Sequence, residues 1–178
     1  MQRTLLALLA LSLSSAIGAG GNPRQVVTAR AVLSTDAAHP ASSAKAVVVA
    51  EIAEGFHIND QKPTLDYLIP TELEFAAGDG VNVANVVYPR GEAKKFAFSK
   101  SPLSVYEGAL KVGVLLKIAP KARPGTRTLK GELKYQACND HACLPPTSAP
   151  VTLAVKVVPR GTALKRINTE LFDSVQFE

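Results

Sequence analysis

The chain has 178 residues, and its 20 Lys and Arg against 15 Asp and Glu give a formal net charge of +5 at pH 7. This length is typical of one domain and is sufficient to bury a hydrophobic core without extra cross-links. The basic residues are scattered, and no aromatic residues interleave with the basic pair Lys94-Lys95. The composition therefore argues against nucleic-acid binding.

The first 19 residues have the layout of a secretory signal peptide. Arg3 supplies a positive charge, residues 5–13 form an apolar run, and the small residues at 16–19 suit a cleavage site. The apolar run is too short to cross a bilayer, which takes about 20 apolar residues. We therefore predict export to the periplasm, one domain over 20–160 and a C-terminal tail over 161–178.

Apolar and polar residues alternate along much of the remaining chain, as is typical of strands with one buried face. The alternation is strict at 46–52, 110–118, 129–137 and 151–157. Further strands are expected near 25–34, 71–76, 82–88 and 94–98. Turn-forming Gly and Pro residues separate these runs. About eight short strands predict an all-β fold, a β-sandwich. Near the C-terminus, Asn168 or Thr169 could cap a single helical turn through Phe172.

The two cysteines, Cys138 and Cys143, follow the strand predicted at 129–137. An even number of cysteines in an exported protein predicts a disulfide. If the alternation continues for one more residue, Cys138 lies on the solvated face, so we expect it to be accessible. Asn139-Asp140 indicates a turn between the cysteines, and Pro145-Pro146 stiffens the chain after them.

Such a pair suits thiol–disulfide exchange, in which a partner's thiolate attacks one sulfur and the second cysteine resolves the mixed disulfide. In the chain-entropy model, a bridge over so short a loop contributes only about 2 kcal/mol to stability, so it can open and close at little cost. His141, which lies between the cysteines, could activate a thiol or transfer a proton.

Two alternatives stay open from the residues alone. The first is a structural or interaction sandwich whose disulfide is inert. The second is a Cu or Zn site built from Cys138, His141 and Cys143, since thiolates and imidazole suit both metals. Hydrolase motifs and a Gly-rich phosphate loop are absent from the sequence, so no cofactor is expected.

The cysteine segment resembles the periplasmic N-terminal domain of the DsbD thiol:disulfide interchange family. The resemblance is carried by Tyr-Gln-Ala-Cys at 135–138 and Cys-Leu-Pro-Pro at 143–146. Supporting segments are Gly-Phe-His-Ile-Asn at 55–59, Ile-Pro-Thr-Glu-Leu at 69–73, Tyr-Pro at 88–89 and Val-Tyr-Glu-Gly at 105–108. Together they cover about residues 45–158.

The resemblance implies an immunoglobulin-like β-sandwich with the cysteine pair at one edge. It implies that Cys138 and Cys143 are the redox pair and that Val105, Tyr106 and Glu107 form a lid over the disulfide. It also places His57 and Asn59 among the side chains that line the site.

The same resemblance implies partners. Family members receive electrons from a membrane thiol transporter through a thioredoxin-like domain. They pass the electrons to periplasmic thioredoxin-fold clients, such as disulfide isomerases or cytochrome c maturation proteins. The membrane and thioredoxin-like domains of DsbD have no counterpart in these 178 residues, so we expect a stand-alone module whose donor is another protein.

Overall fold

A computed structural model describes residues 25–76, 78–97 and 99–177. Within them the chain is almost entirely β, which confirms the predicted all-β fold. The strands are β1 (Val27–Leu33), β2 (Ser43–Ile52), β3 (His57–Asn59), β4 (Glu72–Phe75), β5 (Val81–Val87), β6 (Glu92–Lys94), β7 (Leu103–Tyr106), β8 (Ala109–Ile118), β9 (Gly125–Tyr135), β10 (Ala137–Cys138) and β11 (Thr147–Val157). A short helix, α1 (Thr169–Asp173), follows them. The predicted signal peptide lies outside the described residues.

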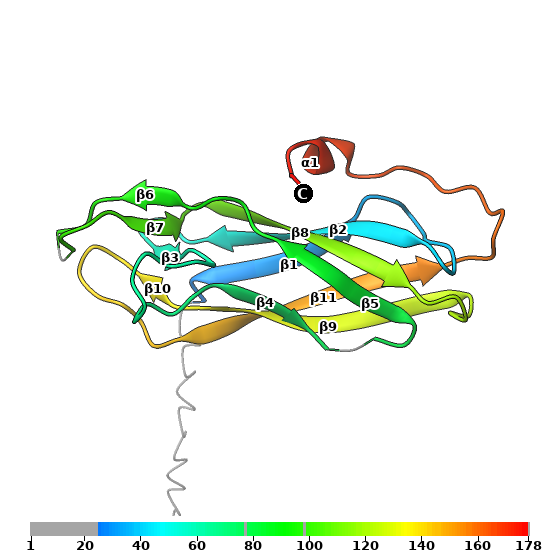
Figure 1. The fold of residues 1–178 in the computed structure, drawn as a ribbon, viewed down its shortest axis with the longest axis horizontal. Coiled ribbons are helices and arrows are strands. Elements are labelled where there is room, and N and C mark those ends of the chain that lie inside the picture. The colour runs from blue at the N-terminus through cyan, green and yellow to red at the C-terminus, as the bar shows by residue number, and fades with distance from the viewer. Residues whose placement is uncertain (1–24, 77, 98, 178) are drawn as a thin grey trace, which may run out of the picture.

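Two antiparallel sheets form the predicted immunoglobulin-like sandwich (Figure 1). One sheet has the strand order β1-β2-β8-β5 and the other has the order β11-β9-β4. Val48 and Val112 of the first sheet share one hydrophobic core with Leu133 and Val151 of the second. All four side chains are at most 1% exposed, because each strand turns alternate residues toward the opposite sheet.

The four strictly alternating segments all form long strands, namely β2, β8, β9 and β11. The prediction of a strand at 94–98 is wrong, since β6 spans Glu92–Lys94. The alternation did not reveal three short strands, namely β3, β7 and β10. A strand of two to four residues contains too few positions to reveal a period of two.

These three short strands belong to one small sheet with the order β10-β3-β7-β6. Figure 1 shows its strands gathered at one end of the sandwich. The cysteine pair enters this sheet through β10. The fold therefore places the disulfide at an end of the molecule, outside the long sheets that form the core.

The segment after β11 lies along the outer side of the first sheet, where Figure 1 shows α1. Phe172 of α1 packs against Val47 and Val49 of β2. The predicted helical turn is confirmed, but Asn168 makes no side-chain cap. Its backbone is left-handed, with φ of 55°, and its side-chain Nδ2 instead donates to the carbonyl oxygen of Leu33 at 2.9 Å.

Candidate functional site: a disulfide beside a covered histidine

Cys138 and Cys143 form a disulfide that closes a tight turn. The backbone N–H of Asn139 donates to the carbonyl of Ala142 at 3.0 Å, and Leu144 N–H donates to the carbonyl of Ala137 at 2.8 Å. The side-chain oxygen of Asn139 accepts the N–H groups of His141 and Ala142, both at 2.9 Å. The predicted disulfide and turn are thus confirmed, and Asn139 is the residue that shapes the turn.

The expectation that Cys138 is accessible is wrong, because Cys138 is only 3% exposed. The alternation of β9 does not continue into the cysteine. The strand ends at Tyr135, Gln136 lies outside any strand, and β10 pairs with β3 instead of with a sandwich strand. Cys143 is the exposed member of the pair. The two cysteines therefore lie in different environments.

The register of the small sheet shows which residues share the face of Cys138. Cys138 pairs with His57, and Asn59 pairs with Val105. Paired residues point to the same face, and so do residues two apart on one strand. Cys138, His57, Asn59 and Val105 therefore lie on one face. Tyr106 lies on the opposite face, where it joins the hydrophobic core.

Phe96 covers this face. Its ring stacks on the imidazole of His57 with 4.3 Å between the ring centroids. Phe96 belongs to the connection between β6 and β7, which we call the cap segment (residues 95–97 and 99–102). His57, which is 3% exposed, is the register partner of Cys138, so the cap segment covers the residue directly beside the buried cysteine.

Val105 and Tyr106, which the family resemblance gave as part of a lid, lie within β7. Both residues are at most 5% exposed, Val105 on the face of Cys138 and Tyr106 on the opposite face, in the hydrophobic core. The ring that covers His57 comes instead from Phe96, near the β6 end of the β6–β7 connection. An available signal was Phe96 itself, an aromatic residue beside two lysines in a stretch without alternation.

Charged residues surround His57. Lys94 and Glu107, which is exposed at the end of β7, form an ion pair. Burial lowers the pKa of His57, and the negative charges of Glu107 and Asp140 oppose this effect without cancelling it. At neutral pH, therefore, a neutral imidazole lies beside the buried sulfur.

Asn59, predicted to line the site, is 2% exposed and is committed to structural contacts. Its Nδ2 donates to the carbonyl of Ile69 at 2.8 Å, and its own carbonyl accepts the hydroxyl of Thr71 at 2.6 Å. These bonds close the loop that follows β3. Asn59 thereby holds β3, and with it His57, in place.

His141 is exposed, and the contact that holds it in the turn comes from its backbone N–H. Among the described residues, no group of three or more His, Cys, Asp and Glu side chains is arranged to hold a metal ion. With the two sulfurs joined, Cys138, His141 and Cys143 do not form the Cu or Zn site considered from the sequence.

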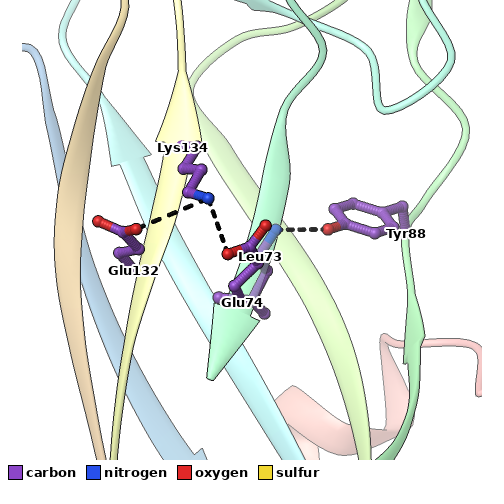
Figure 2. A network of polar contacts seen from close by, with 5 residues as sticks. All are labelled: Leu73, Glu74, Tyr88, Glu132 and Lys134. Atoms are coloured by element: carbon purple, nitrogen blue, oxygen red, sulfur yellow. Dashed lines mark hydrogen bonds and ion pairs between the residues drawn. The ribbon is translucent and has the colours of Figure 1, made fainter. Parts of the chain in front are cut away.

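The strands leading to the site are tied together by a polar network at the edge of the second sheet (Figure 2). Lys134 of β9 pairs with Glu74 of β4 at 2.7 Å and lies 3.8 Å from Glu132. The Tyr88 hydroxyl accepts the N–H of Leu73 at 2.6 Å. Figure 2 shows that these contacts flank the short edge strand β4 from both sides.

A protein-family model described as thiol:disulfide interchange protein DsbD, N-terminal, matches residues 24–154. This chain belongs to the DsbD N-terminal family. The resemblance inferred from the cysteine segment is thereby confirmed. Family membership and the bonded cysteine pair together support a thiol:disulfide interchange module. None of the curated protein sequences matches the chain significantly.

Solved structures show a similar fold at low sequence identity. The N-terminal periplasmic domain of ScsB from Proteus mirabilis is 16% identical with a TM-score of 0.50, over 72% of this chain and 46% of the ScsB chain. The DsbD N-terminal domain of Neisseria meningitidis in its reduced form is 17% identical with a TM-score of 0.43. The match covers 82% of this chain and 93% of the DsbD domain.

The meningococcal DsbD domain has also been solved in complex with the PilB N-terminal domain. It is 17% identical to this chain with a TM-score of 0.41, over 83% of this chain and 92% of that one. The present chain thus matches less than half of the ScsB chain but nearly all of the DsbD domains. No helix in the described residues is long and apolar enough to span a membrane.

Proposed function

We propose that this DsbD-family domain is a periplasmic thiol:disulfide interchange module that relays reducing equivalents to client proteins through Cys138 and Cys143. The observation that carries the proposal is the asymmetry of the pair, in which Cys143 is exposed and Cys138 is buried beside His57. An inert bridge needs no such difference between its two sulfurs, whereas ordered exchange does.

The module is loaded with electrons by attack on Cys143. A donor's thiolate attacks Sγ of Cys143, the Cys138–Cys143 bond breaks, and Cys138 leaves as a thiolate that takes up a proton. The donor's second thiolate then attacks the mixed disulfide and releases Cys143. The donor ends as a disulfide and the module as a dithiol, with two electrons transferred.

Delivery to a client reverses these steps. The thiolate of Cys143 attacks the client disulfide, and one client sulfur leaves as a thiolate. Cys138 loses its proton and resolves the mixed disulfide, so that the Cys138–Cys143 bond forms again and the client is released as a dithiol. The family relationship supports thioredoxin-fold proteins as clients and a membrane thiol transporter, acting through a thioredoxin-like domain, as the source of electrons.

The reduction potential of the pair tests this proposal. The purified domain would be equilibrated against glutathione or dithiothreitol buffers, and its free thiols counted. We expect a value between about −180 and −280 mV, the range of working exchange proteins. A value well below about −300 mV, or reduction only on unfolding, would show an inert structural disulfide.

Trapping experiments test the proposed roles of the two cysteines. A Cys138→Ser variant retains the attacking Cys143 and lacks the resolving thiol. It should accumulate a mixed disulfide with a thioredoxin-fold protein, whereas the matched Cys143→Ser variant should not. Equal trapping by both variants would overturn the assignment of Cys143 as the sulfur that partners attack.

A further inference from the structure

Asp60, a residue that the sequence did not single out, is the centre of a dense set of hydrogen bonds. Its Oδ1 accepts the hydroxyl of Tyr106 at 2.7 Å and the N–H of Lys62 at 3.2 Å. Its Oδ2 accepts the hydroxyl of Ser104 at 2.6 Å and the N–H of Gly91 at 3.1 Å. Four donors thus converge on one partly buried carboxylate.

These donors lie on both sides of the cap segment. Gly91 directly precedes β6, and Ser104 and Tyr106 belong to β7, so the cap segment begins and ends between residues bound to Asp60. Asp60 itself directly follows β3, the strand of His57. A single carboxylate therefore joins the strand that carries His57 to the chain on both sides of the cap segment, at Gly91 before β6 and at Ser104 and Tyr106 in β7.

We propose that Asp60 is a positioning residue for the disulfide site, whose carboxylate holds the cap segment closed over His57 and Cys138. The proposal rests on the exchange function proposed above, because a closed cap leaves Cys143 as the sulfur open to partners. Backbone pairing alone provides a short anchor, since β6 is an edge strand that pairs with β7 through three residues.

The contacts require a carboxylate at this position. Burial would raise the pKa of Asp60, but hydrogen bonds from Ser104, Tyr106, Lys62 and Gly91 outweigh it and lower the pKa. An amide has one acceptor oxygen, and its NH₂ group would face donors where Oδ1 or Oδ2 now accepts. Asp60→Asn therefore keeps the shape of the side chain but breaks some of the four hydrogen bonds.

Gly91 offers an independent way to disturb the contact. A Cβ atom at this position would lie 2.5 Å from Oδ2 of Asp60 and 2.5 Å from Oγ of Ser104. Gly91→Ala would therefore push the Asp60 carboxylate away from the start of β6, the strand that leads into the cap segment, without changing any charge.

The test is the rate at which iodoacetamide alkylates Cys138 in the full mature chain carrying Cys143→Ser, in which Cys138 is the single thiol. We expect slow alkylation in this background and about tenfold faster alkylation when Asp60→Asn is added, as befits the loss of hydrogen bonds to a charged group. Gly91→Ala should also accelerate alkylation. The Phe96→Ala variant, which lacks the covering ring, gives the alkylation rate of Cys138 without its cover.

A double variant separates positioning from general loosening. If Asp60 acts through the cap, then Asp60→Asn added to Phe96→Ala produces no further acceleration. Phe172→Ala is the matched control, because it destabilises the domain far from the cap, and it should leave the rate unchanged. If Asp60→Asn does not fold, Gly91→Ala takes its place in the same comparison.

An unchanged rate in a folded Asp60→Asn variant, or effects of Asp60→Asn and Phe96→Ala that simply multiply, would overturn the proposal. Alkylation requires no partner and no redox buffer. A failure of this inference is therefore distinguishable from a failure of the exchange function, which is measured by the reduction potential.

Discussion

His57 and Cys138 are direct partners across β3 and β10, and each is 3% exposed. Their pairing places an imidazole on the same face as the buried sulfur, beneath the ring of Phe96. Because burial lowers the pKa of His57, this imidazole is neutral near pH 7 and can accept a proton. It is therefore suited to take the proton that Cys138 must lose before it resolves a mixed disulfide.

The buried imidazole predicts how stability depends on pH. The pKa of His57 is lower in the folded protein than its ordinary value of 6.5, so protonation favours the unfolded chain. The buried, neutral His57 therefore makes its full contribution to stability above pH 6.5, and this contribution is lost as the pH falls below that value. Urea unfolding at pH 8 and pH 5 should show a larger loss for the wild type than for His57→Asn. Equal losses would contradict the prediction, since His39 and His141 are common to both proteins.

The unequal burial of the two cysteines predicts unequal reactivity after reduction. In single-thiol variants, the Cys143 thiol of Cys138→Ser should react with iodoacetamide several times faster than the Cys138 thiol of Cys143→Ser, because Cys138 is covered. Mass spectrometry of timed samples would measure both rates. In urea, where the cover is lost, the two rates should converge. A faster reaction at Cys138 in the folded protein would contradict the assigned roles.

Tyr88 protects the edge of the second sheet, so its hydroxyl should contribute to stability. Tyr88→Phe removes the acceptor of the Leu73 N–H and should cost about 1 kcal/mol in the free energy of unfolding. Urea denaturation would measure this loss. Tyr67→Phe is the matched control, because Tyr67 is 78% exposed and should tolerate the change. Equal stabilities of the two variants would show that water replaces the Tyr88 hydroxyl.

The segment after β11 should be part of the folded unit. Phe172 is 9% exposed and packs against Val47 and Val49, so Phe172→Ala should cost about 3 kcal/mol in the free energy of unfolding. Leu164→Ala, at a residue 39% exposed in the same segment, should change little. A loss below about 0.5 kcal/mol for Phe172→Ala would indicate that the segment unfolds separately from the sandwich.

The long strands could be predicted because their signal is local. A strand of seven or more residues with one face on the core, such as β8 or β11, shows the period of two in its own sequence. The disulfide turn is local as well, since Asn139 and the two cysteines lie within six consecutive residues. The family resemblance came from the same short segment, residues 135–146.

The environment of the cysteines could not be predicted in this way. Cys138 is buried because β10 pairs with β3, whose residues lie about 80 positions earlier in the chain, and because Phe96 stacks over the paired His57. The role of Asp60 likewise depends on Gly91, Ser104 and Tyr106, which meet only after β6 and β7 have paired.

The sequence by itself thus determined the sandwich, the disulfide and the family, because strand alternation, turn chemistry and motif residues act between near neighbours in the chain. Only the tertiary structure decided which sulfur is covered, what covers it and which carboxylate holds that cover. Those properties arise from contacts between strands that are distant in sequence, and a local pattern contains no information about such contacts.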